Sequence, residues 1–345
     1  MDYWRPLPVL FDPEDGISGE QKIASLAGVD GLGFALVEKL SRQGPDVRRH
    51  ILSLSDFLKD NPLSSEMISS ARLPLGGLSL NSPRIMGILN VTPDSFFDGG
   101  RHDQVSVAVE HALRMVKEGA DIIDVGGEST RPGADLISID EELNRVIPVI
   151  EALKAKTDAL ISIDTRKPEV MSEAIKAGAD IINDVSALTF DPNSLEVAAE
   201  LNVPVILMHS QGTPEVMQDN PSYNHVVLDI YDYLSASLQR AVEAGVRTEN
   251  IILDPGIGFG KTVSHNCALL KGLSLFHGLG VPLLLGCSRK SYIAALSDGE
   301  AADERLPGSL SGVLLGASQG VQIFRVHDVA ETVQALKTWH CRAPL

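Results

Sequence analysis

Residues 86–96 read Met86-Gly87-Ile88-Leu89-Asn90-Val91-Thr92-Pro93-Asp94-Ser95-Phe96. The run begins apolar and stops abruptly on polar residues, which is typical of a short buried strand that ends in an exposed loop. The same order, a short aliphatic run followed by residues suited to chemistry, returns seven more times downstream. Repeated units of this kind indicate an α/β fold of the (β/α)8 TIM barrel type, in which the active site lies at the carboxyl ends of the strands.

Eight aliphatic runs are the expected barrel strands: residues 85–89, 122–125, 160–163, 181–182, 205–208, 251–253, 283–285 and 321–326. Apolar residues spaced for one helical face lie between them, and a glycine ends two of the predicted helices just before a strand, at Gly119 and Gly178. This alternation over about 260 residues matches the ~250 of a typical barrel. An open doubly wound sheet is the structural alternative, but no single loop carries a dinucleotide fingerprint.

Residues 1–71 lack this alternation, so we expect an N-terminal extension of unknown role followed by the barrel domain at 72–345. Residues 72–80 predict a β-hairpin with Gly76-Gly77 at its turn. Such a hairpin could close the bottom of a barrel that starts at Arg84. We expect the extension itself to form an accessory layer on the barrel.

Composition excludes several classes of protein. A formal charge of −17 over 345 residues argues against a general binder of nucleic acids or anionic membranes. Cys267, Cys287 and Cys341 are odd in number and lack CxxC spacing, and no HxH or HExxH pair indicates a histidine metal centre. No signal peptide and no apolar run of ~20 residues are evident. We therefore expect a soluble, cytoplasmic protein.

The residues that follow the predicted strands are those best suited to chemistry, and in a barrel they would converge on one end. In chain order these segments are 90–95, 126–133, 164–168, 183–185, 208–212, 254–261, 288–291 and 325–328. A barrel whose polar groups were only structural would scatter them between both ends.

These eight segments, in this order, resemble the dihydropteroate synthase family over residues 73–339. Members of the family are transferases of folate biosynthesis that condense 6-hydroxymethyl-7,8-dihydropterin diphosphate with p-aminobenzoate to give 7,8-dihydropteroate and diphosphate. The first 70 residues lie outside the resemblance. It implies a TIM barrel with two small-molecule substrates.

The pterin ring presents an edge of hydrogen-bond donors, and one carboxylate can accept two parallel hydrogen bonds from it. The resemblance gives this role to Asp254. A single aspartate at such a position can instead cap a helix, and for Asp184 the two interpretations are equally good. The other pterin contacts that the resemblance implies are Asp164, Asn183, Met208, Phe259, Lys290 and Arg325.

Departure of diphosphate needs cations where negative charge develops. The resemblance places Asn90, Thr130, Arg325 and His327 on the diphosphate, with Asn90 also contacting Mg2+, which takes few protein ligands. No protein nucleophile is required, because the amine attacks the methylene group left behind. The expected catalytic residues are Asn90, Asp164, Lys290, Arg325 and His327.

Two glycine-flanked loops are expected to form the p-aminobenzoate pocket, where sulfonamides would compete. By resemblance its residues are Phe96, Thr130, Arg131, Pro132, Ser288 and Lys290. The glycines beside these loops suit segments that move and then exclude water. Phe97 and Ser210 depart from the family's commonest residues, so loop closure or inhibitor fit could differ here.

Rival functions remain open on residues alone. The segment 256–262 resembles a nucleotide-binding P-loop, but that pattern needs glycine where Pro255 stands. Lys290 beside Arg289 could form the Schiff base of an aldolase. A pterin-binding methyl-transfer barrel could share Asp164, Asn183 and Asp254, but would have no use for the diphosphate contacts. A non-catalytic binding protein would be expected to have lost Asn90, Lys290 or Arg325.

Residues 308–317 predict an apolar helix with small residues four apart, which permits close helix approach. Packing within the subunit is the default interpretation of such a helix. Because the family is typically dimeric through its late helices, the resemblance implies a homodimer.

Overall fold

The computed structural model describes residues 2–11, 23–44, 46–92, 101–129, 136–212 and 217–340, with the backbone alone at 101–103. Cys341 and five residues of the expected loops lie outside these ranges; the loop residues are Phe96, Phe97, Thr130, Arg131 and Pro132.

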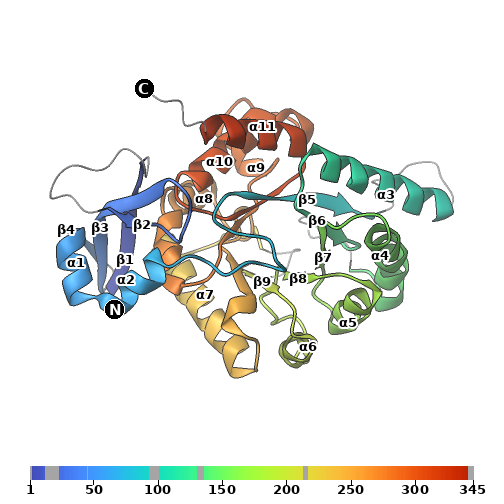
Figure 1. Ribbon diagram of the computed structural model, residues 1–345, viewed down its shortest axis with the longest axis horizontal. Coiled ribbons are helices and arrows are strands. Elements are labelled where there is room, and N and C mark those ends of the chain that lie inside the picture. Colours follow the sequence, from blue (N-terminus) through green and yellow to red (C-terminus); the bar gives the residue numbers. More distant parts are fainter. Residues whose placement is uncertain are drawn as a thin grey trace.

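The main body is a barrel of eight parallel strands, as the strand pattern predicts (Figure 1). The order around it is β10-β9-β8-β7-β6-β5-β12-β11, and a parallel bridge between Leu253 and Leu283 joins β10 to the segment leading into β11. The strands are β5 (Arg84–Asn90), β6 (Ile122–Gly126), β7 (Leu160–Asp164), β8 (Ile181–Asp184), β9 (Val205–Met208), β10 (Ile251–Asp254), β11 (Leu284–Leu285) and β12 (Ile323–Val326).

Helices follow the strands and form the outer ring (Figure 1). They are α3 (Arg101–Glu118), α4 (Ile139–Lys154), α5 (Pro168–Ala177), α6 (Ser194–Leu201), α7 (Val226–Glu243), α8 (Val263–Lys271), α9 (Ser291–Leu296), α10 (Leu306–Ala317) and α11 (Val329–Trp339), with short 3-10 turns η2 (Thr248–Asn250), η3 (Leu273–Leu279) and η4 (Ala302–Glu304).

Several strands extend to the polar residue that the sequence pattern places just after them. Asn90, Asp164 and Asp254 are each the last residue of their strand and remain in the sheet ladder. Asn90 pairs with Gly126, Gly126 with Asp164, and Asp164 with Asn183. Because their backbones are fixed in the sheet, these side chains have well-defined positions at one end of the barrel.

The opposite end of the barrel is closed by the predicted hairpin. Leu75 and Leu78 exchange two backbone hydrogen bonds of 2.9 and 2.8 Å around Gly76 and Gly77, whose positive φ angles suit a tight hairpin turn. Leu75 and Leu80 pack into an apolar cluster of inward-facing strand residues: Met86, Ile122, Ile181, Ile206, Ile252, Leu284 and Ile323. The hairpin therefore seals the bottom of the barrel with hydrophobic contacts.

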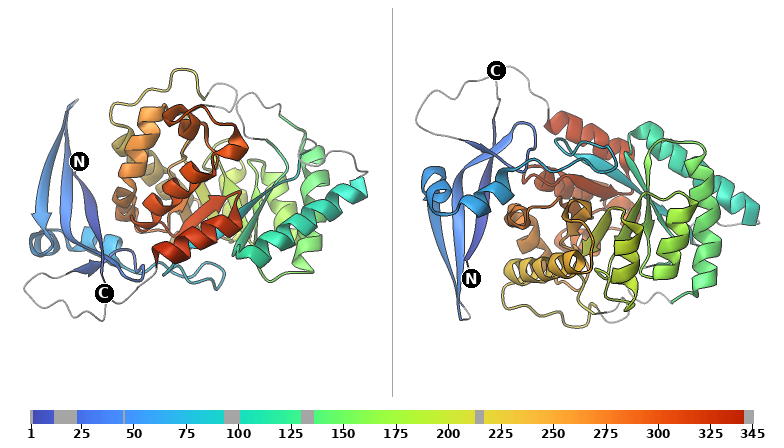
Figure 2. Two further views of the ribbon diagram at one scale, coloured as in Figure 1. Left: turned by 90° about the horizontal axis from the view of Figure 1, so that it is seen from above. Right: turned by 60° about the horizontal axis from the view of Figure 1, so that its bottom comes forward.

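The N-terminal residues form a separate antiparallel sheet beside the barrel, as both views of Figure 2 show. Its strands are β1 (Asp2–Leu10), β2 (Ala24–Ser25), β3 (Leu32–Gln43) and β4 (Asp46–Ser53), followed by α1 (Leu54–Asp60) and α2 (Pro62–Ser69). The central strand β3 pairs with all the others. This layer has its own apolar core, which includes Phe34, Val37, Phe57 and Ile68.

Strand β1 packs the layer against η3, and its Tyr3 side chain reaches α7 of the barrel. The hydroxyl of Tyr3, which is 1% exposed, donates to both carboxylate oxygens of Asp232 at 2.9 and 3.0 Å. Arg42 donates to Tyr3, to Asp229 and to Asp232. The contact between the N-terminal layer and the barrel therefore combines the buried ring of Tyr3 with a network of hydrogen bonds and ion pairs to α7.

Helix α10 turns its small residues toward its own barrel. A Cβ on Gly312 would lie 2.8 Å from Cys287 Sγ, and one on Gly316 would lie 2.6 Å from Leu285. Close packing within the subunit therefore accounts for the spacing of these glycines.

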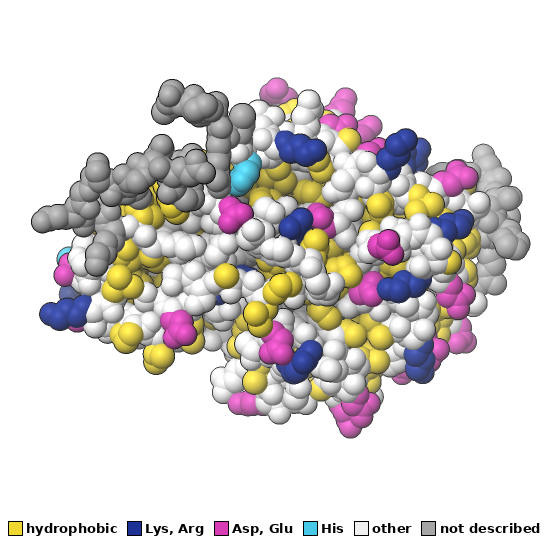
Figure 3. All heavy atoms as spheres, in the orientation of Figure 1, with side chains coloured by type: hydrophobic (Ala, Val, Ile, Leu, Met, Phe, Trp, Pro, Cys, Tyr) yellow, Lys and Arg dark blue, Asp and Glu magenta, His cyan; other side chains and the backbone are white. Residues whose placement is uncertain are grey.

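On the face drawn in Figure 3, basic side chains lie scattered among acidic ones and form no continuous basic surface. Among the described residues, no helix combines the length and apolar character needed to cross a membrane.

Candidate active site at the carboxyl end of the barrel

A cavity of about 710 Å³ opens at the carboxyl ends of the strands. It brings together seven of the predicted site residues: Asn90, Asp164, Phe259, Ser288, Lys290, Arg325 and His327. Asn183, Met208 and Asp254 are buried on the neighbouring strands β8, β9 and β10. The expectation that the strand-end residues converge is therefore confirmed for the described residues.

Arg325 lies at the centre of the polar floor. Its Nε donates to Asp124 Oδ2 at 2.6 Å, and its Nη2 donates to Asp164 Oδ2 at 2.7 Å. Asn183 donates to the same Asp124 oxygen at 3.1 Å. The guanidinium on β12 therefore orients two carboxylates and, through Asp124, an amide, and these three groups come from β6, β7 and β8.

Burial and the neighbouring charges together shift the pKa values of the floor residues. Burial raises the pKa of Asp164 to about 7; Arg325 opposes the rise, while Asp124 adds to it. Burial lowers the pKa of Arg325, but the two neighbouring carboxylates outweigh burial and leave its pKa above the ordinary value. The guanidinium therefore stays charged, and Asp164 can change protonation near neutral pH.

Asp254 is 5% exposed and is fixed by the turn that follows it. Its Oδ1 accepts a 2.7 Å hydrogen bond from the backbone N–H of Gly256, and its Oδ2 has no hydrogen-bond partner among the described residues. Gly256 has φ +69°, and a Cβ there would lie 1.9 Å from the carbonyl oxygen of His209. Only glycine fits this contact, so the turn places a buried acceptor at the site.

Lys290 and Phe259 form one wall. The ammonium of Lys290 lies 4.1 Å from the centroid of the Phe259 ring, within the range of a cation–π contact. Burial lowers the pKa of Lys290 to about 8; Arg325 adds to the fall, while Asp254 opposes it. Lys290 therefore stays mostly protonated at neutral pH.

Ser288 and His327 contact each other at the rim, with 3.0 Å between Ser288 Oγ and His327 Nδ1. Burial, together with the positive charge of Arg325 and Arg289, lowers the pKa of His327 to about 3. His327 is therefore neutral at physiological pH and can offer a neutral ring N–H to an anion.

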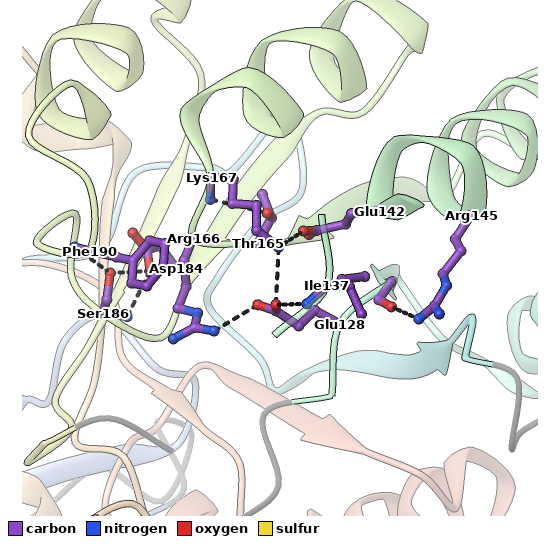
Figure 4. Close-up of polar contacts among 11 residues, drawn as sticks. Glu128, Ile137, Glu142, Arg145, Thr165, Arg166, Lys167, Asp184, Ser186 and Phe190 are labelled. Atoms are coloured by element: carbon purple, nitrogen blue, oxygen red, sulfur yellow. Dashed lines mark hydrogen bonds and ion pairs between the residues drawn. The ribbon is translucent and has the colours of Figure 1, made fainter. Parts of the chain in front are cut away.

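A buried ion cluster lies beside the cavity, between β6, β7 and α4 (Figure 4). Glu128 accepts from Arg166 at 2.7 Å and from Lys167 at 3.0 Å, and Lys167 also contacts Glu142 at 2.5 Å. The guanidinium of Arg166 lies 4.4 Å from the ring centroid of Phe190. Glu128 itself lines the cavity.

Lys261, the lysine of the P-loop-like segment, is not placed to bind phosphate. It is 3% exposed, and its Nζ contacts His209 Nδ1 at 2.9 Å and the carbonyl oxygen of Phe259 at 2.8 Å. Its side chain therefore links the loops after β9 and β10. The structure gives no support to the nucleotide-binding alternative.

Asp124 is the site residue that sequence reasoning missed. It lies inside the apolar run of β6 and not at its end, and it is fully buried. Its Oδ1 has no hydrogen-bond partner in the described part of the chain. An acidic residue within an otherwise aliphatic buried strand was the available signal, because an ionised carboxylate there needs a partner.

Asp184 does not reach the cavity floor. Its Oδ1 accepts from the backbone and hydroxyl of Ser186 at 2.7 Å each, and its Oδ2 accepts from Leu188 N–H at 2.9 Å. Asp184 therefore orders the turn after β8, and it is not the helix cap that was the alternative expectation, because the N-cap of α6 is Asn193. Ser210 lines a smaller neighbouring cavity of about 330 Å³ that also includes Phe259.

Comparisons with known proteins agree with this geometry. The family model described as "Pterin binding enzyme" matches residues 86–327. The dihydropteroate synthase of Escherichia coli (strain K12) is 52% identical over 260 residues, which cover 75% of this chain and 92% of that protein.

Two solved structures are similar throughout the barrel. The Xanthomonas albilineans dihydropteroate synthase with 4-aminobenzoic acid has a TM-score of 0.74 and 48% identity, covering 79% of this chain and 99% of its own. The Yersinia pestis dihydropteroate synthase with a sulfonamide drug has a TM-score of 0.73 and 47% identity, covering 77% and 97%. From its sequence, fold and strand-end site, the chain belongs to the dihydropteroate synthase family of pterin binding enzymes.

Proposed function

We propose that the cavity binds a dihydropterin diphosphate and p-aminobenzoate and condenses them to dihydropteroate and diphosphate. The observation that carries this proposal is the buried acceptor set. Asp164, Asn183 and Asp254 lie on neighbouring elements of the barrel floor, and Lys290 and Arg325 lie among them. A flat ring with a donor edge and an adjacent anionic group fits this arrangement.

The pterin ring would be held by its donors and its two faces. Asp254 Oδ2, which has no hydrogen-bond partner among the described residues, is available to a ring donor, and the N–H of Gly256 keeps the carboxylate in place. Lys290 lies close enough to Asp254 for the carboxylate to raise the pKa of the lysine. The ammonium of Lys290 can donate to a ring acceptor. Met208 and Phe259 supply apolar contact, and the Arg325 guanidinium can stack on the ring.

The reaction needs no protein nucleophile. The carbon–oxygen bond between the methylene group and the diphosphate breaks, and the electron pair leaves with the diphosphate. The amine nitrogen of p-aminobenzoate then forms the new carbon–nitrogen bond, and its proton is released. Positive charge on the pterin methylene is stabilised by the carboxylates of the floor, while Arg325 and His327 bind the leaving oxygens.

A divalent metal is compatible with the residues present. The described residues contain no cluster of three or more His, Cys, Asp or Glu side chains that could hold a metal ion. Asn90 offers a single amide oxygen at the cavity wall, which suits Mg2+ held mainly by substrate phosphate oxygens and water. When bound, the metal would neutralise charge developing on the diphosphate.

The amine side of the site includes Ser288 and Lys290, which line the cavity. Phe96, Thr130, Arg131 and Pro132 are proposed to complete this pocket, and Thr130 to contact the diphosphate as well. Because a sulfonamide resembles p-aminobenzoate in shape, we propose that sulfonamides compete for the same pocket.

Further proposals concern the assembly. An apolar groove of about 360 Å³ runs between α8, α9 and α10 and includes Leu270, Ile293 and Leu315. We propose that a second copy of the chain covers it, giving a cytoplasmic homodimer. Residues 1–71 act as a structural layer outside the catalytic domain. Sedimentation of the protein with Leu315→Glu, compared with the wild type, tests the dimer, because a charge there should dissociate it.

The test of the activity is a two-substrate assay on the full chain with Mg2+. Diphosphate and dihydropteroate should form together and only when both substrates are present. Release that does not depend on p-aminobenzoate would contradict the proposal. Methyl transfer to or from a pterin without diphosphate release would favour the methyl-transfer barrel instead.

A further inference from the structure

The loop after β10 presents Phe259 between two glycines. Gly258 and Gly260 both have positive φ angles, of 85° and 61°. Because glycine adopts many backbone conformations, a ring between two glycines has no fixed direction unless other contacts hold the backbone. Phe259 lines both the main cavity and the smaller cavity beside it. The contacts that hold this loop therefore determine where the ring lies in the site.

Three consecutive carbonyl oxygens of this loop, those of residues 258–260, each accept a hydrogen bond from a side chain. The donors, in that order, are Gln218 Nε2 at 2.6 Å, Lys261 Nζ at 2.8 Å and the Tyr223 hydroxyl at 2.7 Å. The first two bonds hold the peptide groups on either side of the Phe259 Cα, and the third holds the next peptide group. The backbone that carries the ring is therefore fixed on both sides.

Two of these donors come from the segment between β9 and α7 and not from the loop itself. Gln218 lines the main cavity, whereas Tyr223 lines neither of the two cavities in the described part of the chain. The Tyr223 ring packs edge-on against His265, with 4.9 Å between ring centroids. Burial raises the pKa of Tyr223 to about 12, so its hydroxyl stays protonated and donates. Tyr223 therefore reaches the site through the backbone of the loop.

The position of the Phe259 ring matters because of what lies beside it. The ammonium of Lys290 is 4.1 Å from the ring centroid, and a Cβ on Gly258 would lie 3.0 Å from Lys290 Cδ. Contact between a flat ligand and an aromatic ring depends on how the two rings are oriented. A ring that is held in place before the ligand arrives also loses less freedom on binding.

We infer that Tyr223 and Gln218 are positioning residues for the pterin ring, and that they act through the backbone that carries Phe259. The inference rests on the proposed function, in which Phe259 contacts the pterin. Tyr223 does not touch the reacting atoms. Removal of its hydroxyl should therefore weaken pterin binding and leave diphosphate binding intact.

Tyr223→Phe tests this by removing one hydroxyl. The Kd for 6-hydroxymethyl-7,8-dihydropterin should rise about fivefold, the size expected for one lost neutral hydrogen bond. The Kd for diphosphate should change by less than about twofold, as for an ordinary surface substitution. Calorimetric titration measures both. Tyr231→Phe is the matched control, because the chemical change is the same and Tyr231 contacts Tyr3 and Phe276 on the side of the N-terminal layer. The control should bind both ligands as the wild type does.

A double-mutant cycle with Phe259→Ala separates positioning of the ring from a general effect on the fold. If Tyr223 acts through the ring, Tyr223→Phe should change the pterin Kd by less than about twofold once the ring is absent. Effects of the two substitutions that multiply would overturn the inference.

Gln218→Leu removes the donor to Gly258 at an exposed position, and it serves as a second variant in the same cycle. Unchanged pterin affinity in the folded variants, or equal losses for pterin and diphosphate, would overturn the inference. Failure of both variants to fold would also overturn it, because the two side chains would then be structural. A wild-type protein that binds no pterin would instead contradict the proposed function.

Discussion

The two ends of the barrel differ sharply in what their inward-facing side chains do. At the bottom, Leu75 and Leu80 of the hairpin pack with Ile122, Ile206 and Ile252 in an apolar cluster. At the top, the side chains inside the barrel are polar or charged: Asp124, Asp164, Asn183, Asp254 and Arg325.

The side chains of the bottom cluster are buried and apolar, as in an ordinary protein core, whereas those named at the top are buried but polar or charged. Asp124 Oδ1 is buried and has no hydrogen-bond partner in the described part of the chain, and burial raises the pKa values of Asp164 and Asp254. Such groups cost folding free energy when no ligand is bound. The difference indicates that the bottom cluster and the helix packing stabilise the fold, while the top end is arranged for a ligand. The predictions below test this division in order of their expected effect on the free energy of unfolding.

Ile122→Ala should have the largest effect on stability. Ile122 is fully buried in the bottom cluster, and removing its side chain leaves a cavity that should cost ~2–5 kcal/mol of unfolding free energy. The KM values of the folded variant should stay close to wild type, since the site lies at the other end. Denaturant unfolding measures the loss, and Ile139→Ala, 37% exposed on α4, serves as the control.

Asp164→Asn should remove a pH dependence of stability. The folded-state pKa of Asp164 is about 7, above the ordinary value of 3.8, so the protonated form is favoured on folding. Its stabilising contribution is fully present below about pH 4 and is lost as the pH rises through about 7. In the variant this part of the decline should disappear. Urea unfolding of both proteins from pH 4 to 8 checks it, and parallel curves would contradict the assigned direction.

Tyr3→Phe should have a smaller effect, confined to the N-terminal layer. The change removes the hydroxyl that donates to Asp232 and accepts from Arg42, at an expected cost of ~1 kcal/mol. Pterin affinity should not change, because the layer docks on η3 and α7, whereas the described walls of the main cavity come from other elements. Thermal unfolding and a pterin titration measure the two quantities. Altered pterin affinity would show that the layer belongs to the site.

Most of the barrel could be predicted because it is built from local patterns. Each strand is a short aliphatic run, and Gly76-Gly77 specifies a hairpin turn without information from elsewhere in the chain. The N-terminal sheet could not be predicted in the same way. Its main pairing joins Asp2 to Ser41 and continues to Leu10 with Leu32, so its register depends on contacts between distant parts of the chain.

The site shows the same limit. Asn90, Asp164 and Asp254 were predicted because they end strands, and parallel strands end at the same side of a barrel. Asp124 was missed because it lies one layer deeper, where its partners Arg325 and Asn183 come from other strands. The ion pair between Glu128 and Arg166 could not be predicted either, since spacing along the chain does not determine which charged side chains meet.

Asp254→Asn tests the central claim most directly, and it should leave stability unchanged or slightly improved. The amide replaces one carboxylate acceptor with a donor that faces the pterin's own donors. Pterin affinity should fall at least about tenfold, or ~1.4 kcal/mol, because a buried donor loses its partner. Affinity for diphosphate alone should not change, because Asn90, Arg325 and His327 are untouched. Calorimetric titration of pterin and diphosphate into the variant measures both. Unaltered pterin binding would remove Asp254 from the site and contradict the account.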